Sequence, residues 1–442
     1  MCRNFIDQNK IKTPKKETFS MSNYNTLGQD IYTTKRSIYH FSSKLSAGMQ
    51  KPNRKFLLDM LYGLAKGKSV LLSDIAHALE EPIDTIQTIK RLSSRLEAFH
   101  EEDALLDNYS QIIKPHINEN DNLVIVDNSE IIKPYSHKLE ALGYVRDGST
   151  DKIEKGYWTT NMIAIGKQTK HPIPVYSHLY SSVEKGFISE NEETYKGLRH
   201  VRNVLAEKKA TFIMDRDYDN VKIMKKVLGQ RDDFIIRLKK NRHLIYQNKK
   251  LSVRDLALRR KGKINFRSVI KGTEYDLKVS HITVQIPSLK GQKLTMVVVY
   301  GYGQEPMVLL TNKRVQKKNE VLSILKAYIT RWRIEEMFRV QKQEFQLEDI
   351  RVRSLKRLNR LLLLVSMMIT FMSIKIEKKN GFFHAIIARA RGIKEKDQIR
   401  MFLYRFSAGM KAILDKDTHG IQHFKYIEKA KNPRQLKLKL AL

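Results

Sequence analysis

Cysteine, acidic residues and long apolar runs are all scarce in this sequence, and each shortage excludes a class of protein. Cys2 is the single cysteine, so neither an internal disulfide nor a zinc site built from several cysteines can form. The stretch closest to a membrane span, Leu361–Ile374, is shorter than the ~18–20 residues that cross a bilayer, and we interpret it as a buried helix. Residues 1–13 lack the apolar region of a signal peptide, so we expect none.

The charge balance is strongly basic. The 442 residues include 82 Lys and Arg against 47 Asp and Glu, which gives a formal net charge of +35. Such an excess predicts a polyanionic partner. A membrane surface is the competing explanation, and we favour nucleic acid. The length allows two to four structural units with a substantial core.

Histidine offers one pair with a spacing that metal ligands use. His419 and His423 form an HxxxH pattern, but Gly420 follows the first of them where a zinc protease has glutamate. We therefore interpret both as ordinary surface or core residues.

The segment from Tyr328 to Lys342 contains neither glycine nor proline and is predicted to be one helix. At about 100° per residue, its polar signature residues would share a face. These residues are Tyr328, Arg331, Glu335, Arg339 and Lys342. Glu336 would point about 100° away from Glu335. Arg331 and Glu335 also form an i,i+4 pair of the kind found on solvated helices, which is the simplest alternative explanation.

Two more acidic residues follow short apolar runs of the kind that form buried strands. Leu123–Val126 leads into Asp127, and Thr211–Met214 leads into Asp215. A carboxylate just past the end of a strand lies at the rim of the sheet, and we expect both acids there. Together with Glu335 they would provide three hard oxygen ligands for divalent metal.

These motifs resemble those of DDE transposases of the insertion-sequence-four family. The Tyr-x2-Arg-x3-Glu-x6-Lys signature is met by Tyr328, Arg331, Glu335 and Lys342. The contexts of the two aspartates, Asp-Asn-Ser at 127–129 and Asp-Arg-Asp-Tyr at 215–218, also match. The resemblance covers roughly residues 122–373.

The resemblance implies an α/β protein with a ribonuclease-H-like catalytic core, a β-strand insertion, and helical N- and C-terminal regions. It implies two Mg²⁺ ions, for which Mn²⁺ can substitute. Asp127 would bridge both ions, while Asp215 and Glu335 would each hold one. The partner would be double-stranded DNA, both as transposon ends and as target, bound by a homodimer, and a hairpin intermediate is one excision route. We expect a bacterial, cytoplasmic protein associated with the nucleoid and no membrane partner.

The implied reaction is cleavage at terminal inverted repeats, followed by joining of the 3′-hydroxyl to target DNA. Two alternatives stay open: a nuclease of the same fold that cuts without joining, and a DNA-binding protein that has lost catalysis. The presence of all three expected acids argues against the second.

The basic residues near the acids have two interpretations. Arg331, Arg339 and Lys342 would contact phosphates near the metals, and Tyr328 would hydrogen-bond a phosphate. In the alternative they pair with acids elsewhere. A basic run follows a predicted strand and is either a DNA contact or a solvated edge: Arg237, Lys239, Lys240 and Arg242.

The order of elements divides the chain into six regions. They are a flexible basic arm (1–50), a helical DNA-binding region (51–120), the first part of the core (121–244), the insertion (245–305), the second part of the core (306–376) and a basic helical C-terminal region (377–442). The arm would contact DNA or act as a solubilising tail. The C-terminal region would lie on DNA, lie on a second protomer or be solvated.

Two features of these regions have open roles. Leu72–Leu79 and a helix capped by Asp84, with Gln87 three residues later, would form either a helix-turn-helix or a plain helical subdomain. Ile86, Ile89, Leu92 and Leu96 are its predicted buried face, with Lys90, Arg91 and Arg95 left polar. In the insertion, the aromatic residues that could stack a flipped base are Phe266, Tyr275, Tyr300 and Tyr302.

Overall fold

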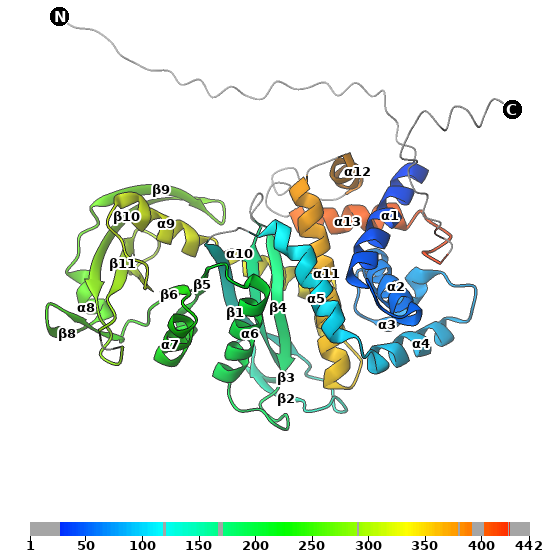
Figure 1. Cartoon of the computed structure of the whole chain (residues 1–442), viewed down its shortest axis with the longest axis horizontal. Helices are drawn as coiled ribbons and strands as arrows, with labels where there is room; N and C mark the ends of the chain where they lie inside the picture. The colour runs from blue at the N-terminus through cyan, green and yellow to red at the C-terminus, as the bar shows by residue number, and fades with distance from the viewer. Residues whose placement is uncertain are drawn as a thin grey trace, which may run out of the picture.

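A large mixed sheet forms the centre of the molecule. The computed structural model describes residues 27–117, 121–166, 171–289, 291–378, 381–390, 402–422 and 424. In Figure 1 the sheet runs from the centre to the left, and helices from both ends of the chain gather at its right. The protein is thus a mixed α/β structure, as the sequence predicts.

The N-terminal helices are α1 (Leu27–Leu45), α2 (Lys51–Gly67), α3 (Leu72–Leu79), α4 (Thr85–Ala98) and α5 (Glu102–Ile113). The prediction of a flexible arm up to residue 50 is wrong from Leu27 onward, and the rest of the arm lies outside the described residues. The buried stripe of α1 mixes Ile38, Phe41 and Leu45 with polar side chains. Asp30 pairs with Arg389 of α12, and Lys35 pairs with Asp417. Because Asp30 and Lys35 lie on the buried face of α1, the sequence of this helix lacks the regular apolar stripe of an amphipathic helix.

Helix α3 has the predicted bounds, and α4 begins directly after Asp84 as predicted. The Asp84 side chain caps α4, but it accepts from the backbone N–H of Ile86 at 3.2 Å rather than from Gln87. The predicted buried face is wrong at Ile86, which is 47% exposed. Arg91 is not a solvated residue, because its guanidinium binds Asp59 and Glu81, each at 2.7 Å. Ion pairs with α2 and with the turn therefore hold α4 in place.

The sheet contains ten strands among the described residues. Its first part is β1 (Asn122–Ile132), β2 (Gly143–Arg146), β3 (Ile153–Ile165), β4 (Pro172–Tyr180), β5 (Ala210–Met214) and β6 (Asp233–Arg237). Strand order is β2-β3-β1-β5-β6-β12-β11-β10-β9, with β4 also paired to β3. β1, β5 and β6 are parallel, and their neighbours on both sides are antiparallel. Helices α6 (Glu190–Leu205) and α7 (Val221–Gly229) connect β4, β5 and β6.

Strands β9, β10 and β11 of the insertion belong to this sheet, whereas β7 and β8 pair with each other as a separate two-stranded sheet. The insertion comprises β7 (His243–Tyr246), β8 (Lys249–Ser252), α8 (Val253–Leu258), β9 (Ile264–Ile270), β10 (Thr273–Val284) and β11 (Leu294–Tyr300). β11 pairs with β12 (Met307–Thr311), which pairs with β6 and so returns to the core as predicted. The β9–β10 pair closes through a two-residue turn, Lys271-Gly272.

The aromatic residues of the insertion are occupied in packing. Tyr275 and Tyr302 lie with ring centroids 5.2 Å apart, and both pack against the core. The Tyr300 hydroxyl donates to the backbone oxygens of Ala257 and Arg260 at 2.7 and 2.9 Å. Phe266 lies under the ammonium of Lys326 from α9, 5.5 Å from the ring centroid. Each of these rings therefore has a structural role in this conformation.

The prediction of one helix over residues 328–342 is wrong. α9 (Lys318–Ile329) ends before the signature is complete, α10 (Trp332–Arg339) follows, and Val340–Glu344 form a π-helical turn. At the break, the Thr330 hydroxyl donates to the backbone oxygen of Ala327 at 2.6 Å. Such a bond from a side chain back to the preceding turn competes with helix continuation.

The apolar helix of the C-terminal half is the long α11 (Leu355–Lys378), which is almost entirely buried and contains Leu361–Ile374. It packs against β4 and α2, so its apolar length serves the core, as predicted. No helix in the described part of the chain has the length and apolar content that a membrane span needs. α12 (Gly381–Arg389) and α13 (Phe402–Leu414) pack on α1 and α11 (Figure 1). Within region 377–442, residues 379–380, 391–401, 423 and 425–442 lie outside the described residues.

Candidate active site

The parallel register of β1 and β5 brings the first two acids level. Val126 pairs with Met214, so the next residues, Asp127 and Asp215, lie side by side on adjacent strands. The prediction that Asp127 follows the end of its strand is wrong, because β1 continues to Ile132 against β3. Asp215 does end its strand, and its Oδ1 accepts from the N–H of Asp217 at 2.9 Å. The pairing between β1 and β5 therefore stops here because β5 ends, whereas β1 continues.

Arg331 joins the third acid to this pair. Its guanidinium donates to Asp127 Oδ2 at 2.8 Å and to Glu335 Oε1 at 2.6 Å. The break between α9 and α10 places Arg331 at the first turn of α10, from which it reaches back to β1. The other oxygen of Glu335, Oε2, accepts from the Lys271 ammonium at 2.6 Å. Residues far apart in the sequence thus share one cluster of charges.

The protonation equilibria of the three acids reflect this shared cluster. Burial raises the pKa of Asp127 to about 7; the Arg331 charge opposes this shift, and the Asp215 and Glu335 charges add to it. Burial also raises the pKa of Asp215. Burial acts to raise the pKa of Glu335 too, but the bonds and charges of Lys271 and Arg331 outweigh it, so the pKa is lowered. The positive charges of Arg331 and Lys271 therefore offset part of the negative charge of the three acids.

The donors in this cluster fit a divalent cation, although they are not gathered around one point. Among the described residues, no group of three or more His, Cys, Asp or Glu side chains is close enough to hold a metal ion. The Arg331 guanidinium lies between two of the three acids, Asp127 and Glu335, and binds both. Asn161, paired with Asp127 across β1 and β3, is fully buried, and its Oδ1 has no hydrogen-bond partner. Carboxylate and amide oxygens are the ligands that hard divalent cations prefer.

The remaining signature residues lie around this cluster in different settings. Tyr328 is buried, with the charges of Arg331 and Arg237 near its hydroxyl. The Lys342 ammonium pairs with Glu130 at 2.8 Å and with Glu348 at 3.3 Å, as the ion-pair interpretation expected. Arg339 is exposed. Only Arg331 of the predicted phosphate contacts touches the predicted metal ligands.

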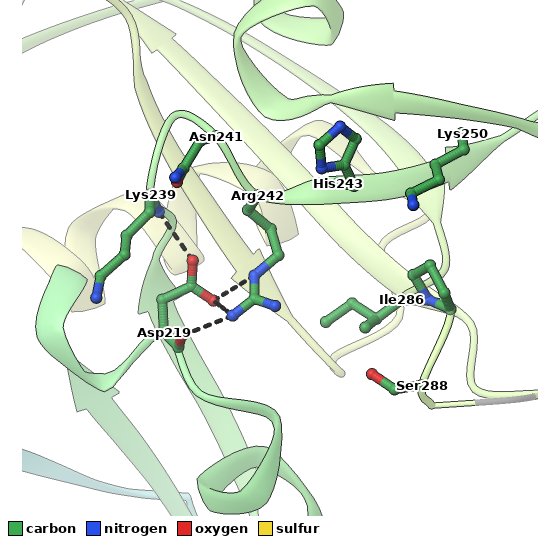
Figure 2. Close-up of a pocket in the computed structure, with 9 residues that line it drawn as sticks. Asp219, Lys239, Asn241, Arg242, His243, Lys250, Ile286 and Ser288 are labelled. Carbon is green, nitrogen blue, oxygen red and sulfur yellow. Dashed lines mark hydrogen bonds and ion pairs between the residues drawn. The ribbon is translucent and has the colours of Figure 1, made fainter.

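The predicted basic run divides into anchored and exposed residues. A pocket of about 350 Å³ is lined by Asp219, Lys239 and Arg242, among others. Figure 2 shows Asp219 bound to both Arg242 and the backbone of Lys239. Arg242 Nε and Nη2 lie 2.9 and 2.7 Å from Asp219 Oδ1, and the Lys239 N–H lies 2.9 Å from Oδ2. Lys240 pairs with Glu305, and the Lys239 side chain is exposed. Arg242 thus anchors the loop after β6. Among Lys239, Lys240 and Arg242, Lys239 is the one whose exposed side chain has no ion-pair partner in the described structure.

This geometry predicts a structural effect for Arg242. Asp219 is buried, and three donors of the Lys239–Arg242 loop bind its carboxylate. Arg242→Ala should destabilise the protein by about 1–3 kcal/mol, the cost of leaving a buried acceptor unsatisfied. The change is measured as a lowered Tm, with Lys239→Ala as the matched control from the same loop. Equal Tm values for the two variants would contradict this role.

Sequence reasoning missed two residues of the site, Lys271 and Asn161. The Lys271-Gly272 dipeptide lies between β-prone runs and is a turn signal, but nothing local predicts that its tip reaches α10. No local signal in the sequence marks Asn161, and only the β1–β3 register places it beside Asp127. Both assignments depend on pairing between distant segments.

Comparison with known proteins identifies a family for the segment that contains most of the site residues. A family model described as a transposase DDE domain matches residues 147–371, just over half of the chain. The match includes Asp215, Lys271, Arg331 and Glu335, while Asp127 precedes it. No curated protein matches.

Two solved structures share a limited likeness with the chain. The piggyBac transposase synaptic complex with hairpin DNA is 10% identical with a TM-score of 0.42, over 94% of this chain and 84% of that one. The NurA nuclease of Sulfolobus solfataricus is 12% identical with a TM-score of 0.24, over 68% of this chain and 99% of that one. Likenesses of this size carry no argument about the fold or the function of this chain.

Proposed function

The chain belongs to the family of transposase DDE domains, and from this membership we propose a DNA transposase that depends on divalent metal ions bound by Asp127, Asp215 and Glu335. The observation that carries the proposal is that the β1–β5 register places Asp127 beside Asp215, while Arg331 binds both Asp127 and Glu335. The signature residues support a placement within the insertion-sequence-four family. The metal is Mg²⁺, with Mn²⁺ as a substitute.

We also propose a ribonuclease-H-like core for this chain. Antiparallel β4, β3 and β1 are followed by β5 and β6 parallel to β1, with α6 and α7 as connections. This arrangement supports the proposal because Asp127 and Asp215 directly follow the last paired residues of two adjacent parallel strands, Val126 of β1 and Met214 of β5.

The side chains of the cluster have separate tasks in the proposed reaction. When bound, the ions would activate a water molecule or a 3′-hydroxyl and neutralise charge on the leaving oxygen. Arg331 holds Asp127 and Glu335 together and offers a planar guanidinium for a DNA phosphate once an ion replaces it on these two acids. The buried Tyr328 holds the end of α9 beside Arg237. Lys342 ties the π-helical turn to β1 through Glu130.

We propose double-stranded DNA as the partner, bound by a homodimer that holds two transposon ends. The net charge of +35 supports a polyanionic partner. Lys239 lines a pocket together with Asp215, and Arg339 lies four residues after Glu335 on α10; both are exposed and are the favoured phosphate contacts among the predicted residues. Arg242, Lys240 and Lys342 are held in ion pairs, so we give them a smaller part in binding.

The test of this function uses a supercoiled plasmid that carries the DNA flanking the coding region on both sides. Full-length protein with Mg²⁺ should cut at short inverted repeats and join the freed 3′ ends to a second plasmid. Cleavage without joining would identify a nuclease, and binding without cleavage would identify a protein that has lost catalysis. Either result would overturn the proposal.

The salt dependence of binding tests the phosphate contacts. Replacing Arg339 by glutamine should reduce the magnitude of the slope of log K against log salt by about 0.9, the value expected for one phosphate contact on duplex DNA. Lys225→Gln, at an exposed position on α7, is the control and should leave the slope unchanged. The measurement is a titration of labelled end DNA by anisotropy over a range of salt concentrations. An unchanged slope for Arg339→Gln would remove it from the interface.

A further inference from the structure

The turn between β9 and β10 carries a lysine in a conformation that lysine does not favour. Ile270 pairs with Thr273, so Lys271 and Gly272 are the two central residues of the turn. Their φ angles are 49° and 83°, both in the left-handed region. Two-residue turns of this kind strongly prefer Asn, Asp or Gly at the first position. A lysine here indicates that its side chain has a use that outweighs a poor turn.

The use that the structure shows is a contact with the candidate metal ligand Glu335. The Lys271 ammonium lies 2.6 Å from Glu335 Oε2, across a sequence separation of 64 residues. Arg331 occupies Oε1 of the same carboxylate at 2.6 Å. Both oxygens of Glu335 are therefore held by cationic side chains.

The two cations differ in how firmly they are held. Arg331 also binds Asp127, and its side chain is 21% exposed. Lys271 is 55% exposed, and Glu335 is the one acid it pairs with in the described structure. Lys271 can therefore leave Glu335 with the loss of a single half-exposed ion pair, whereas Arg331 must break two.

We propose that Lys271 is a positioning residue that holds Glu335 Oε2 in the DNA-free protein and competes with the divalent cation for it. The inference rests on the proposed function, because it takes Glu335 as a metal ligand. A divalent cation on Glu335 Oε2 would face the ammonium across a few ångströms, and the two positive charges would repel each other. Binding of the cation thus requires Lys271 to withdraw. The released ammonium, on an exposed turn beside the site, then has the charge to pair with a backbone phosphate of the bound DNA.

The test is Mn²⁺ binding to the full-length, DNA-free protein, followed by electron paramagnetic resonance of the free ion. Lys271→Gln should bind Mn²⁺ about two- to fivefold more tightly than the wild type, the range that loss of one half-exposed ion pair implies. Lys271→Arg keeps the charge and should bind as weakly as the wild type. Lys278→Gln removes a charge from the exposed face of β10, roughly 20 Å along the strand, and should change little.

Glu335→Gln separates the two ways in which the inference can fail. If Glu335→Gln weakens Mn²⁺ binding while Lys271→Gln binds no more tightly than Lys278→Gln, Lys271 does not compete and the inference is overturned. The proposed metal site would then stand. If Mn²⁺ binds neither the wild type nor Lys271→Gln, the metal site itself is wrong, and the inference falls with it.

Discussion

Asp127→Asn, Asp215→Asn and Glu335→Gln should each reduce Mg²⁺-dependent cleavage of end DNA by more than about 100-fold, since even outer-shell partners of metal ligands cost 10–100-fold. Each change removes a charged oxygen donor while keeping the shape of the side chain. The three acids are coupled through Arg331 and through their mutual repulsion, so the loss of any one alters the balance of the whole cluster. Binding of end DNA should remain, because the exposed cations are unchanged.

The matched control for Glu335 is its neighbour. Glu336 lies one residue along α10 and about 100° around it, and its buried carboxylate pairs with Arg333 at 2.9 Å. Burial raises the pKa of Glu336, so a neutral glutamine suits that position. Glu336→Gln should therefore retain cleavage within a few fold. Both variants are assayed on the plasmid with paired ends, in Mg²⁺ and in Mn²⁺. If Glu336→Gln lost cleavage while Glu335→Gln retained it, Glu336 rather than Glu335 would be the metal ligand on α10.

Asp127→Asn should also make the metal-free protein more stable, and increasingly so as the pH rises. The pKa of Asp127 is about 7 in the folded protein, where burial and the charges of Asp215 and Glu335 oppose ionisation. In an unfolded chain it would be about 3.9. The folded state therefore holds a proton that the unfolded state loses between about pH 4 and pH 7, and stability falls as the pH rises through this window. Asparagine cannot ionise and avoids this cost, whose upper bound is about 4 kcal/mol.

The measurement is the Tm of both proteins in EDTA from pH 5 to pH 8. The advantage of Asp127→Asn should grow up to about pH 7 and then level off. Asp107→Asn, at an exposed position on α5, is the control and should show no comparable trend. A constant or shrinking advantage would show that Asp127 ionises easily in the fold. Divalent cations should reverse the order of the two proteins, because only the carboxylate can bind them.

How well the sequence predicts the structure varies from element to element. The apolar runs before Asp127 and Asp215 are local patterns, and both are strands. The spacing from Tyr328 to Lys342 is also local, and it identified the residues around the cluster although the helix itself is broken. A period of 3.6 residues predicts which residues share a face only while the helix continues. The bond from Thr330 to Ala327 ends that continuity, and the sequence pattern does not predict it.

By itself the sequence determined the acids, the signature and the need for a polyanionic partner, because residue type, spacing and net charge are properties of the chain alone. Tertiary structure decided which Lys and Arg side chains remain exposed for contact with DNA. Arg242 and Lys342 are bound to Asp219, Glu130 and Glu348, whereas Arg339 stays exposed. It also decided that Lys271, 64 residues before Glu335, holds that carboxylate. An ion pair depends on two side chains meeting in space. Strand register and turn geometry decide that meeting, and they form only when distant segments pack together.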